Sequence, residues 1–194
     1  MKKILISIVI LLSAAATVFG QSVNVGYLNS SYIHNGRNST TTTAGNGAYA
    51  GIETDLNVLP ISNSCISAGV YFDFVNYRLS DYLAARTFSF RIPVHFKYSI
   101  GLGRTEVLFV SAGPSATIGA FGDYITTIGN TSHKENFYTD DNSRFDLSLG
   151  AKVGIDLSHT FRVSVGYDFG LLDQNPRDPV VNRNFLQVGV GYLF

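Results

Sequence analysis

Apolar and polar residues alternate with a period of two through most of this chain. The segment Thr87–Ile100 shows the pattern most clearly. Its apolar positions are Phe88, Phe90, Ile92, Val94, Phe96 and Tyr98, and its intervening positions are Ser89, Arg91, Pro93, His95, Lys97 and Ser99. A β-strand points successive side chains to opposite faces, so this segment predicts a strand with one bulky apolar face and one mostly polar face.

The same alternation predicts eight strands. Their ranges are Ser22–Ile33, Gly47–Val58, Ser64–Tyr77, Thr87–Ile100, Thr105–Thr117, Ser143–Leu157, Thr160–Leu171 and Asn184–Phe194. The fifth strand is the least regular, because apolar residues compete for both faces between Val107 and Val110. Gly113-Pro114 is expected to form a bulge that switches the register of this strand.

The predicted connections alternate in length. Long polar segments follow the first, third, fifth and seventh strands, at Asn35–Thr43, Arg78–Arg86, Ile118–Asn142 and Asp173–Arg183, whereas the other connections are short. Transmembrane barrels of outer membranes combine long outer loops with short periplasmic turns. This asymmetry favours such a barrel, with both ends of the mature chain in the periplasm.

Aromatic residues on the apolar face fall into two groups by depth. Those near the outer rim are Phe74, Phe88, Phe145 and Phe169, and those near the inner rim are Tyr98, Phe161, Tyr192 and Phe194. Aromatic side chains gather at both boundaries between membrane and water, so the two groups predict two membrane-interface girdles.

The chain ends on Gly191-Tyr192-Leu193-Phe194. This ending resembles the terminal strand of bacterial outer-membrane β-barrels, and the resemblance implies that Tyr192 and Phe194 form the signal read by the barrel-assembly machinery. The whole mature chain resembles the small eight-stranded barrels of the OmpA-transmembrane-domain and OmpX class. It is most similar to the outer membrane protein beta-barrel domain, PorT-like group. The fold class implied is all-β, an eight-stranded antiparallel up-and-down transmembrane β-barrel of a Gram-negative bacterium.

A secretory signal peptide is predicted at the N-terminus. Met1-Lys2-Lys3 is basic, Ile4 to Val18 is apolar, and the chain is expected to be cleaved after Gly20. The apolar run is short for a transmembrane anchor, which needs about 20 residues. The predicted organisation is therefore a signal peptide at residues 1–20 and one barrel domain at residues 21–194, located in the outer membrane.

Composition excludes several function classes. Removal of Lys2 and Lys3 leaves 12 basic against 14 acidic residues, a formal charge of −2, which gives no argument for a nucleic-acid partner. Cys65 is the only cysteine, so an internal disulfide and a cysteine metal cluster are both excluded. The chain has 19 Gly, 11 Tyr and 14 Phe, a composition that suits closely packed strands.

Charged side chains fall on the polar face, which would line the barrel interior. The predicted lumen charge network contains Glu53, Asp55, Asp73, Arg91, His95, Lys97, Asp146, Lys152, Asp156, Arg162 and Asp168. The interior of an eight-stranded barrel is just wide enough for side chains to fill it. Buried charges of both signs must pair there, because an isolated one costs several kcal/mol. We therefore expect a closed, salt-bridged lumen.

Residues with catalytic potential are few. His95 and Ser99 lie on the lumen face of one predicted strand, separated by three residues. Eight-stranded lipid A deacylases instead present a His and a Ser, separated by one residue, to the lipid, so a hydrogen-bonded lumen histidine is favoured here. Asp123 and Asp140-Asp141-Asn142 lack the ordered spacing of a calcium loop and are expected to be solvated. No catalytic residue, metal site or cofactor is predicted.

Three functions remain open. The favoured one is a non-enzymatic outer-membrane barrel with a structural or surface-interaction role. It would contact outer-membrane lipid and present the loops His34–Asn46 and Ile118–Asn142 to a surface partner. A lipid-modifying enzyme is disfavoured, because the lipid-facing positions are apolar or aromatic. A soluble, exported, lipocalin-like barrel would have the same alternation with its faces exchanged. The terminal Phe, the rim aromatics and the glycine-rich polar face argue against that exchange.

Membrane fractionation distinguishes these alternatives. The mature chain is expected to remain with outer membranes and to migrate differently on a detergent gel before and after boiling, because a closed barrel resists unfolding by detergent. Recovery of the chain in the soluble periplasmic fraction without detergent would instead mean that the apolar face lines a ligand pocket.

Overall fold

The computed structural model describes residues 21–35, 40–128, 131–139, 143–174 and 181–194. Every regular element in these ranges is a β-strand. The strands are β1 (Gln21–Asn35), β2 (Thr40–Leu56), β3 (Ser64–Arg78), β4 (Leu83–Gly101), β5 (Val107–Ile128), β6 (Thr131–Asn136), β7 (Phe145–Leu157), β8 (Phe161–Gly170) and β9 (Val181–Leu193). No helix in the described ranges is long and apolar enough to cross a membrane.

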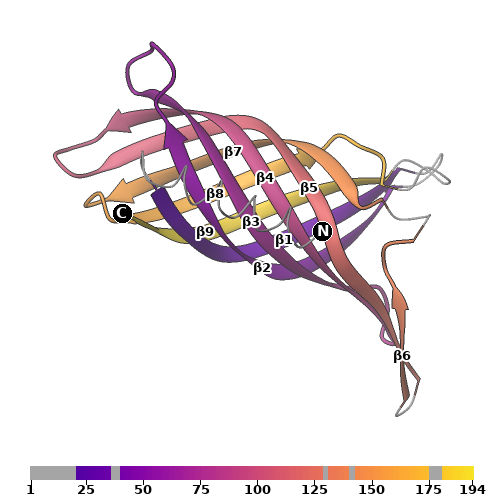
Figure 1. Ribbon diagram of the computed structural model, residues 1–194. Helices are drawn as coiled ribbons and strands as arrows, with labels where there is room; N and C mark the ends of the chain where they lie inside the picture. The colour runs from indigo at the N-terminus through magenta and orange to yellow at the C-terminus, as the bar shows by residue number, and fades with distance from the viewer. Residues whose placement is uncertain (1–20, 36–39, 129–130, 140–142, 175–180) are drawn as a thin grey trace, which may run out of the picture.

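The strands form one closed antiparallel barrel (Figure 1). Their order is β4-β3-β2-β1-β9-β8-β7-β5-β6, and β4 also pairs with β5. With β6 set aside, the remaining eight strands close into a ring in which every neighbour is antiparallel. The first strand meets the last along most of its length, with Val25 opposite Val190. The predicted fold class is confirmed.

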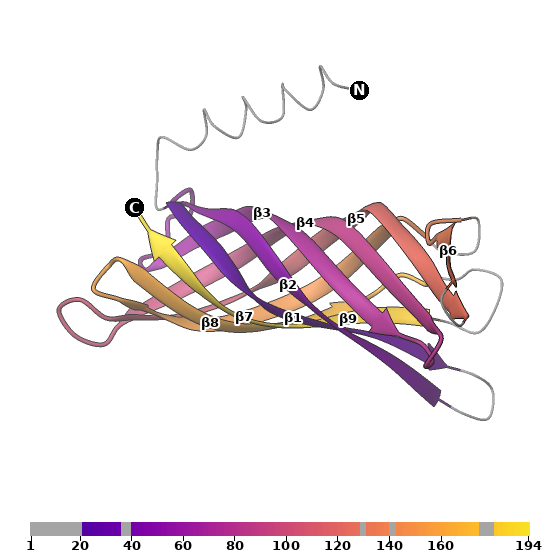
Figure 2. The ribbon, with the colours of Figure 1, turned by 90° about the horizontal axis from the view of Figure 1, so that it is seen from below.

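The barrel has two different ends. Ser22 pairs with Leu193, so the beginning of β1 and the end of β9 share one end, here called the terminal end. The β2–β3, β4–β5 and β7–β8 connections lie at the terminal end too. The opposite end, here called the loop end, carries the hairpin of β5 and β6 (Figure 2).

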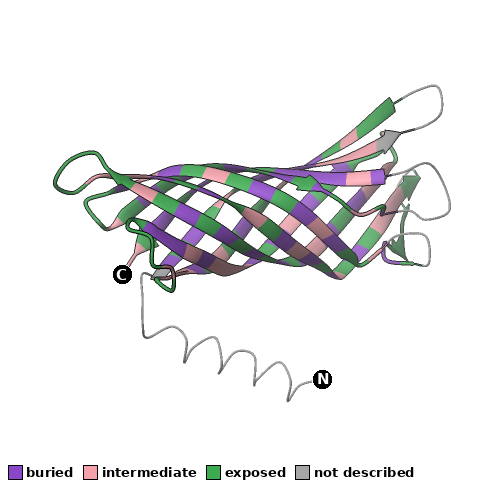
Figure 3. Cartoon of the chain, turned by 90° about the horizontal axis from the view of Figure 1, so that it is seen from above, coloured by how far each residue is buried: buried purple, intermediate pink, exposed green. Residues whose placement is uncertain are grey.

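Buried and exposed residues alternate along most of each strand of the barrel (Figure 3). On β1, Asn24 is 5% exposed and Val25 is 47% exposed. On β4, Arg91 is 1% exposed and Phe90 is 42% exposed. The polar face therefore points into the barrel and the apolar face points outwards. This is the arrangement of a membrane barrel and the reverse of a lipocalin.

Several segments predicted as loops are strands. β1 continues to Asn35 and β2 begins at Thr40, so the Thr-rich run belongs to a hairpin and not to a loop. β3 and β4 likewise extend into the segment predicted as a loop between Arg78 and Arg86. These segments were predicted as loops because their sequences show no apolar face that could be buried. A hairpin outside the membrane needs no apolar face, because hydrogen bonds between its two strands satisfy the backbone groups. The β-branched Thr residues also favour the strand conformation.

The segment Ile118–Asn142 was also predicted as a loop, and this was wrong for most of its length. β5 runs on to Ile128, and β6 pairs with its end, for example Asp123 with Asn136. The register shift lies opposite Phe88 and Ser89, at Ala120 in β5, and not at Gly113-Pro114. It moves Phe121 to the outer face, which explains why simple alternation failed there.

Gly113 keeps the regular register, opposite Gly150. A Cβ at Gly113 would overlap the carbonyl oxygen of Val94, so this glycine permits close approach of the strands and does not form a bulge. The predicted signal peptide, residues 1–20, and Asp140-Asp141-Asn142 lie outside the described residues.

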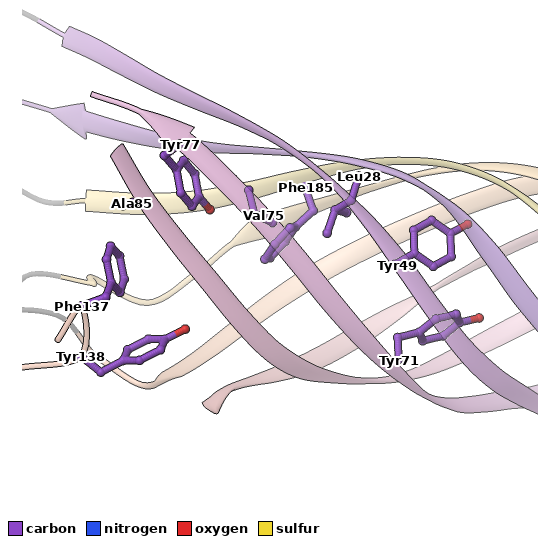
Figure 4. Close-up of a cluster of buried hydrophobic side chains, with 9 residues drawn as sticks. All are labelled: Leu28, Tyr49, Tyr71, Val75, Tyr77, Ala85, Phe137, Tyr138 and Phe185. Atoms are coloured by element: carbon purple, nitrogen blue, oxygen red, sulfur yellow. The ribbon is translucent and has the colours of Figure 1, made fainter. Parts of the chain in front are cut away.

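A cluster of buried apolar and aromatic side chains fills the interior towards the loop end (Figure 4). Phe137 and Tyr138 follow β6 and belong to this cluster, where the Phe137 backbone N–H donates to the carbonyl of Gly122 at 2.9 Å. The segment after β6 therefore folds back over the loop end of the barrel. Burial raises the pKa of the Tyr138 phenol above its ordinary value, and the positive charge of Arg183 opposes that shift.

Gly189 gives a test of how tightly the interior is packed. A Cβ at this position would overlap the Tyr49 hydroxyl and lie 2.7 Å from the carbonyl oxygen of Val25. Gly189→Ala is expected to destabilise the barrel by about 1–3 kcal/mol through overpacking, measured by urea unfolding in detergent micelles. The control is Gly101→Ala, because a Cβ there meets nothing within 4 Å. Equal stability of the two variants would contradict the tight contact between β9 and Tyr49.

Candidate functional site

The interior of the barrel holds the densest group of charged side chains in the described structure, and it is the candidate functional site. Each of these residues sits on the inward face of its strand because of the two-residue period. Barrel closure brings together oppositely charged residues that lie up to 109 positions apart, as in the contact of Arg162 with Glu53. The contacts fall into two ion-pair clusters and a third group near the loop end.

The first cluster centres on Glu53 of β2. Its Oε2 accepts hydrogen bonds from Lys152 Nζ at 2.5 Å and from the Tyr71 hydroxyl at 2.6 Å. Its Oε1 accepts from Arg162 Nη1 at 3.0 Å. Glu53 is 5% exposed. The carboxylate of Glu53 therefore partly neutralises the positive charges of Lys152 on β7 and Arg162 on β8. Both of its oxygens accept hydrogen bonds.

The guanidinium of Arg162 is also held on its other side. Its Nε and Nη2 donate to the two oxygens of Asp156 at 2.7 and 2.9 Å, in a bidentate pair. Nearby, Lys97 Nζ donates to Asp55 Oδ2 at 2.6 Å. The ring of Phe109 lies against both cations, 4.6 Å from Lys97 Nζ and 4.6 Å from the Arg162 guanidinium carbon. The face of this ring attracts both cations through cation–π interactions.

The second cluster centres on Arg91 of β4. Its Nε and Nη2 donate to the two oxygens of Asp73 at 2.8 and 3.2 Å, and its Nη1 donates to Asp168 Oδ2 at 3.2 Å. Gln187 Nε2 donates to the same Asp168 oxygen at 2.7 Å. The Arg91 guanidinium also faces the Tyr71 ring at 5.1 Å. This cluster joins β3, β4, β8 and β9 across the barrel.

Arg183 of β9 is the main cation near the loop end. Its Nε donates to Ser30 Oγ at 3.2 Å, and its guanidinium faces the ring of Phe185 at 4.5 Å and of Tyr32 at 5.5 Å. The Tyr77 hydroxyl donates to the same Ser30 oxygen at 2.8 Å. This group is held mainly by hydroxyl and aromatic contacts.

Two predicted members of the lumen network are inside the barrel but outside the ion pairs. Asp146 is 2% exposed, and neither of its oxygens has a hydrogen-bond partner within the described ranges. The ring nitrogens of His95 lie 3.3 Å from Ser115 Oγ and 3.5 Å from Ser111 Oγ. Ser99 is not among the described partners of His95, so the two residues form no catalytic pair.

Sequence reasoning missed several interior residues. Arg183 was assigned to a loop, although extending the two-residue period back from Gln187 would have placed Phe185 and Arg183 inwards. Phe109 was left unassigned, and it is 1% exposed between the two cations. Extending the two-residue period back from Ser115 and Ser111 would have placed Phe109 inwards, although Leu108 and Val110 are equally apolar.

The predicted interface aromatics lie on the outer surface. Phe74 and Phe88 are 4.9 Å apart by ring centroid, and Phe88 stacks on Phe121 at 4.4 Å, which extends the row beyond the prediction. At the terminal end, Tyr192 lies 6.1 Å from Phe161 and 6.4 Å from Phe194. The remaining predicted members, Tyr98, Phe145 and Phe169, are also exposed.

The described residues contain no group of three or more His, Cys, Asp or Glu side chains arranged to hold a metal ion. The lumen carboxylates other than Asp146 instead bind Lys and Arg. What this arrangement can do is join strands across the barrel and fill the space between them with paired charges.

A substitution at Asp73 tests how much the second cluster, centred on Arg91, contributes to the stability of the barrel. Asp73→Asn is expected to destabilise the barrel by about 3–5 kcal/mol, because it leaves the buried Arg91 with only part of its countercharge. The free energy of unfolding is measured by urea titration in micelles, with Asp81→Asn as the control because Asp81 is exposed in the β3–β4 connection. Equal effects of the two variants would mean that the Arg91 cluster carries little of the stability.

Comparison with solved structures shows similar barrels. Ail of Yersinia pestis, in complex with the heparin analogue sucrose octasulfate, is 13% identical over 91% of this chain and 99% of its own, with a TM-score of 0.50. Neisserial surface protein A is 11% identical over 90% of this chain and 97% of its own, with a TM-score of 0.51. Identities this low show a common fold alone.

The outer membrane enzyme PagL is 12% identical over 86% of this chain and 98% of its own, with a TM-score of 0.46, too low to support an argument about activity. Comparison with curated proteins gave no match. The profile of the outer membrane protein beta-barrel domain family matches residues 15–174. This match covers most of the chain and agrees with its closed barrel and outward apolar face. The chain belongs to the outer membrane protein beta-barrel domain family.

Proposed function

We propose that this protein is a non-enzymatic barrel of the outer membrane, with a structural and surface-interaction role and a closed lumen. The observation that carries this proposal is the set of buried ion pairs across the interior. Arg91 and Arg162 each bind two carboxylates at 3.2 Å or less, and Lys97 and Lys152 bind one each. Paired side chains at this spacing occupy the path that water or ions would follow.

The proposal includes the route to the membrane. Residues 1–20 would be removed as a signal peptide during export, and Tyr192 and Phe194 would be read by the barrel-assembly machinery. The terminal end would then face the periplasm and the loop end the exterior. This orientation places the β1–β2 and β5–β6 hairpins at the cell surface, where the exposed strand β6 is available to a partner.

The apolar character of the described outer face supports a non-enzymatic role. In the described ranges, the outward positions on the membrane-spanning parts of the strands are predominantly apolar, and His95 points into the barrel. A lipid-modifying reaction needs its general base on the side where the lipid lies.

Planar-bilayer recording tests the closed lumen. The reconstituted protein is expected to give no stepwise currents, under conditions in which a general porin gives them. Stable current steps of uniform size would show that the interior conducts and would overturn the proposed closure.

The non-enzymatic role is tested separately on lipid. Lipid A from cells that express the protein is expected to have the same mass as lipid A from cells that express His95→Ala or no protein. Loss of an acyl chain with the unsubstituted protein but not with His95→Ala would identify an enzyme.

A further inference from the structure

The outer face of β3, β4, β5 and β6 carries a basic patch directly beyond a row of aromatic rings. Strand pairing aligns its residues in rows, because directly opposite residues of an antiparallel ladder share a face. The first row is Phe74, Phe88 and Phe121. The next row is Asn76, Arg86, Asp123 and Asn136, and the row beyond it is Arg78, Ala84, Ile125 and Lys134. We call Arg78, Arg86 and Lys134, with Asn76 and Asp123, the rim patch.

The cations of the rim patch have no countercharge in contact. Arg78, Arg86 and Lys134 are exposed, and none forms an ion pair within 4.0 Å among the described residues. Arg144 differs, because its guanidinium is used internally and donates to the carbonyl of Ala120 at 3.2 Å. With Asp123 as its one carboxylate, the rim patch has a formal charge of +2.

The described outer faces of β1 and β2 lack such a charge. On β1 and β2, the comparable outward positions beyond the apolar belt are Asn29, Ser31 and Asn46. These side chains are uncharged and bind one another, for example Asn29 Nδ2 donating to Asn46 Oδ1 at 3.1 Å. If the rim needed only polar side chains, uncharged amides such as those of Asn29 and Asn46 would be sufficient. The guanidinium groups on β3 and β4 therefore call for a different explanation.

The height of the rim patch points to a lipid head group. Stacked aromatic rings mark the boundary between the apolar layer and the polar head groups. Phe88 contacts both Phe74 and Phe121, and the apolar wall continues below through Phe72 and Phe90. A ligand anchored by acyl chains would lie along this wall and present its head group to Arg86, one row above.

The chemistry of the rim patch fits phosphate. A guanidinium binds the oxygens of a phosphate in a bidentate way. Arg78 and Arg86 are diagonal neighbours on adjacent strands, a spacing of about 7–8 Å that lets two side chains converge on one head group. We propose that the rim patch binds the phosphorylated head group of a lipid of the outer leaflet. The proposal depends on the outer-membrane location and not on whether the lumen is closed.

Lipid titration followed by native mass spectrometry tests this site. The delipidated, full mature protein in detergent is titrated with bisphosphorylated lipid A and, separately, with the same lipid after removal of its phosphates. Arg86→Gln is expected to weaken binding of the phosphorylated lipid about tenfold, and R78Q/R86Q is expected to weaken it further. The matched control is Arg104→Gln, because Arg104 is exposed in the β4–β5 connection at the terminal end.

Three results would overturn the proposal. They are equal binding of the two lipids, equal loss in Arg104→Gln and Arg86→Gln, or unchanged lipid binding in R78Q/R86Q. If the double variant instead loses binding to a soluble sulfated polysaccharide while lipid binding is unchanged, the rim patch serves an acidic partner outside the membrane. Unchanged heat-modifiable migration of each variant verifies folding, which exposed side chains are not expected to affect.

Discussion

The pairing of β1 with β9 is the interaction on which the rest of the structure depends. It joins the ends of the chain through a continuous antiparallel register from Ser22 and Leu193 to His34 and Val181. Without it, two strand edges would present unpaired N–H and C=O groups to lipid, at a cost of several kcal/mol for each group. Closure removes both edges, and it also fixes the width of the interior that the side chains must fill.

That width explains the composition of the lumen. Long charged side chains from opposite walls meet at hydrogen-bond distance, as Glu53 meets Lys152 at 2.5 Å. Aromatic rings complete the packing, and Phe109 and Tyr71 each contact cations that also bind carboxylates. Glycines accommodate this bulk: at Gly154, a Cβ would lie 2.5 Å from the Phe109 ring. A salt bridge in such a site need not add stability over an apolar pair, but removal of one partner is costly.

The outer surface of the barrel is governed by contact with lipid and not by packing between side chains. Acyl chains are as apolar as the side chains that face them, so the apolar face adds little to the attraction between strands and mainly sets the depth of the barrel. Beyond the apolar belt, the two sides of the loop end differ chemically. Amides on β1 and β2 satisfy one another, whereas Arg78 and Arg86 on β3 and β4 remain available beyond the Phe88 row. A surface ligand is therefore better sought on the β3–β6 side.

The sequence by itself determined the all-β class, the inward and outward faces and most of the charged lumen residues, because a period of two is a local property of each strand. It also predicted the outward position of Phe88 and Tyr192. It did not determine where the outer hairpins end, since strands beyond the membrane need no apolar face. Only the tertiary structure decided that Phe109 contacts both Lys97 and Arg162, that Arg183 binds Ser30, and that Asp146 stays outside the ion pairs. These outcomes depend on barrel closure, which brings distant residues together and leaves no trace in local periodicity.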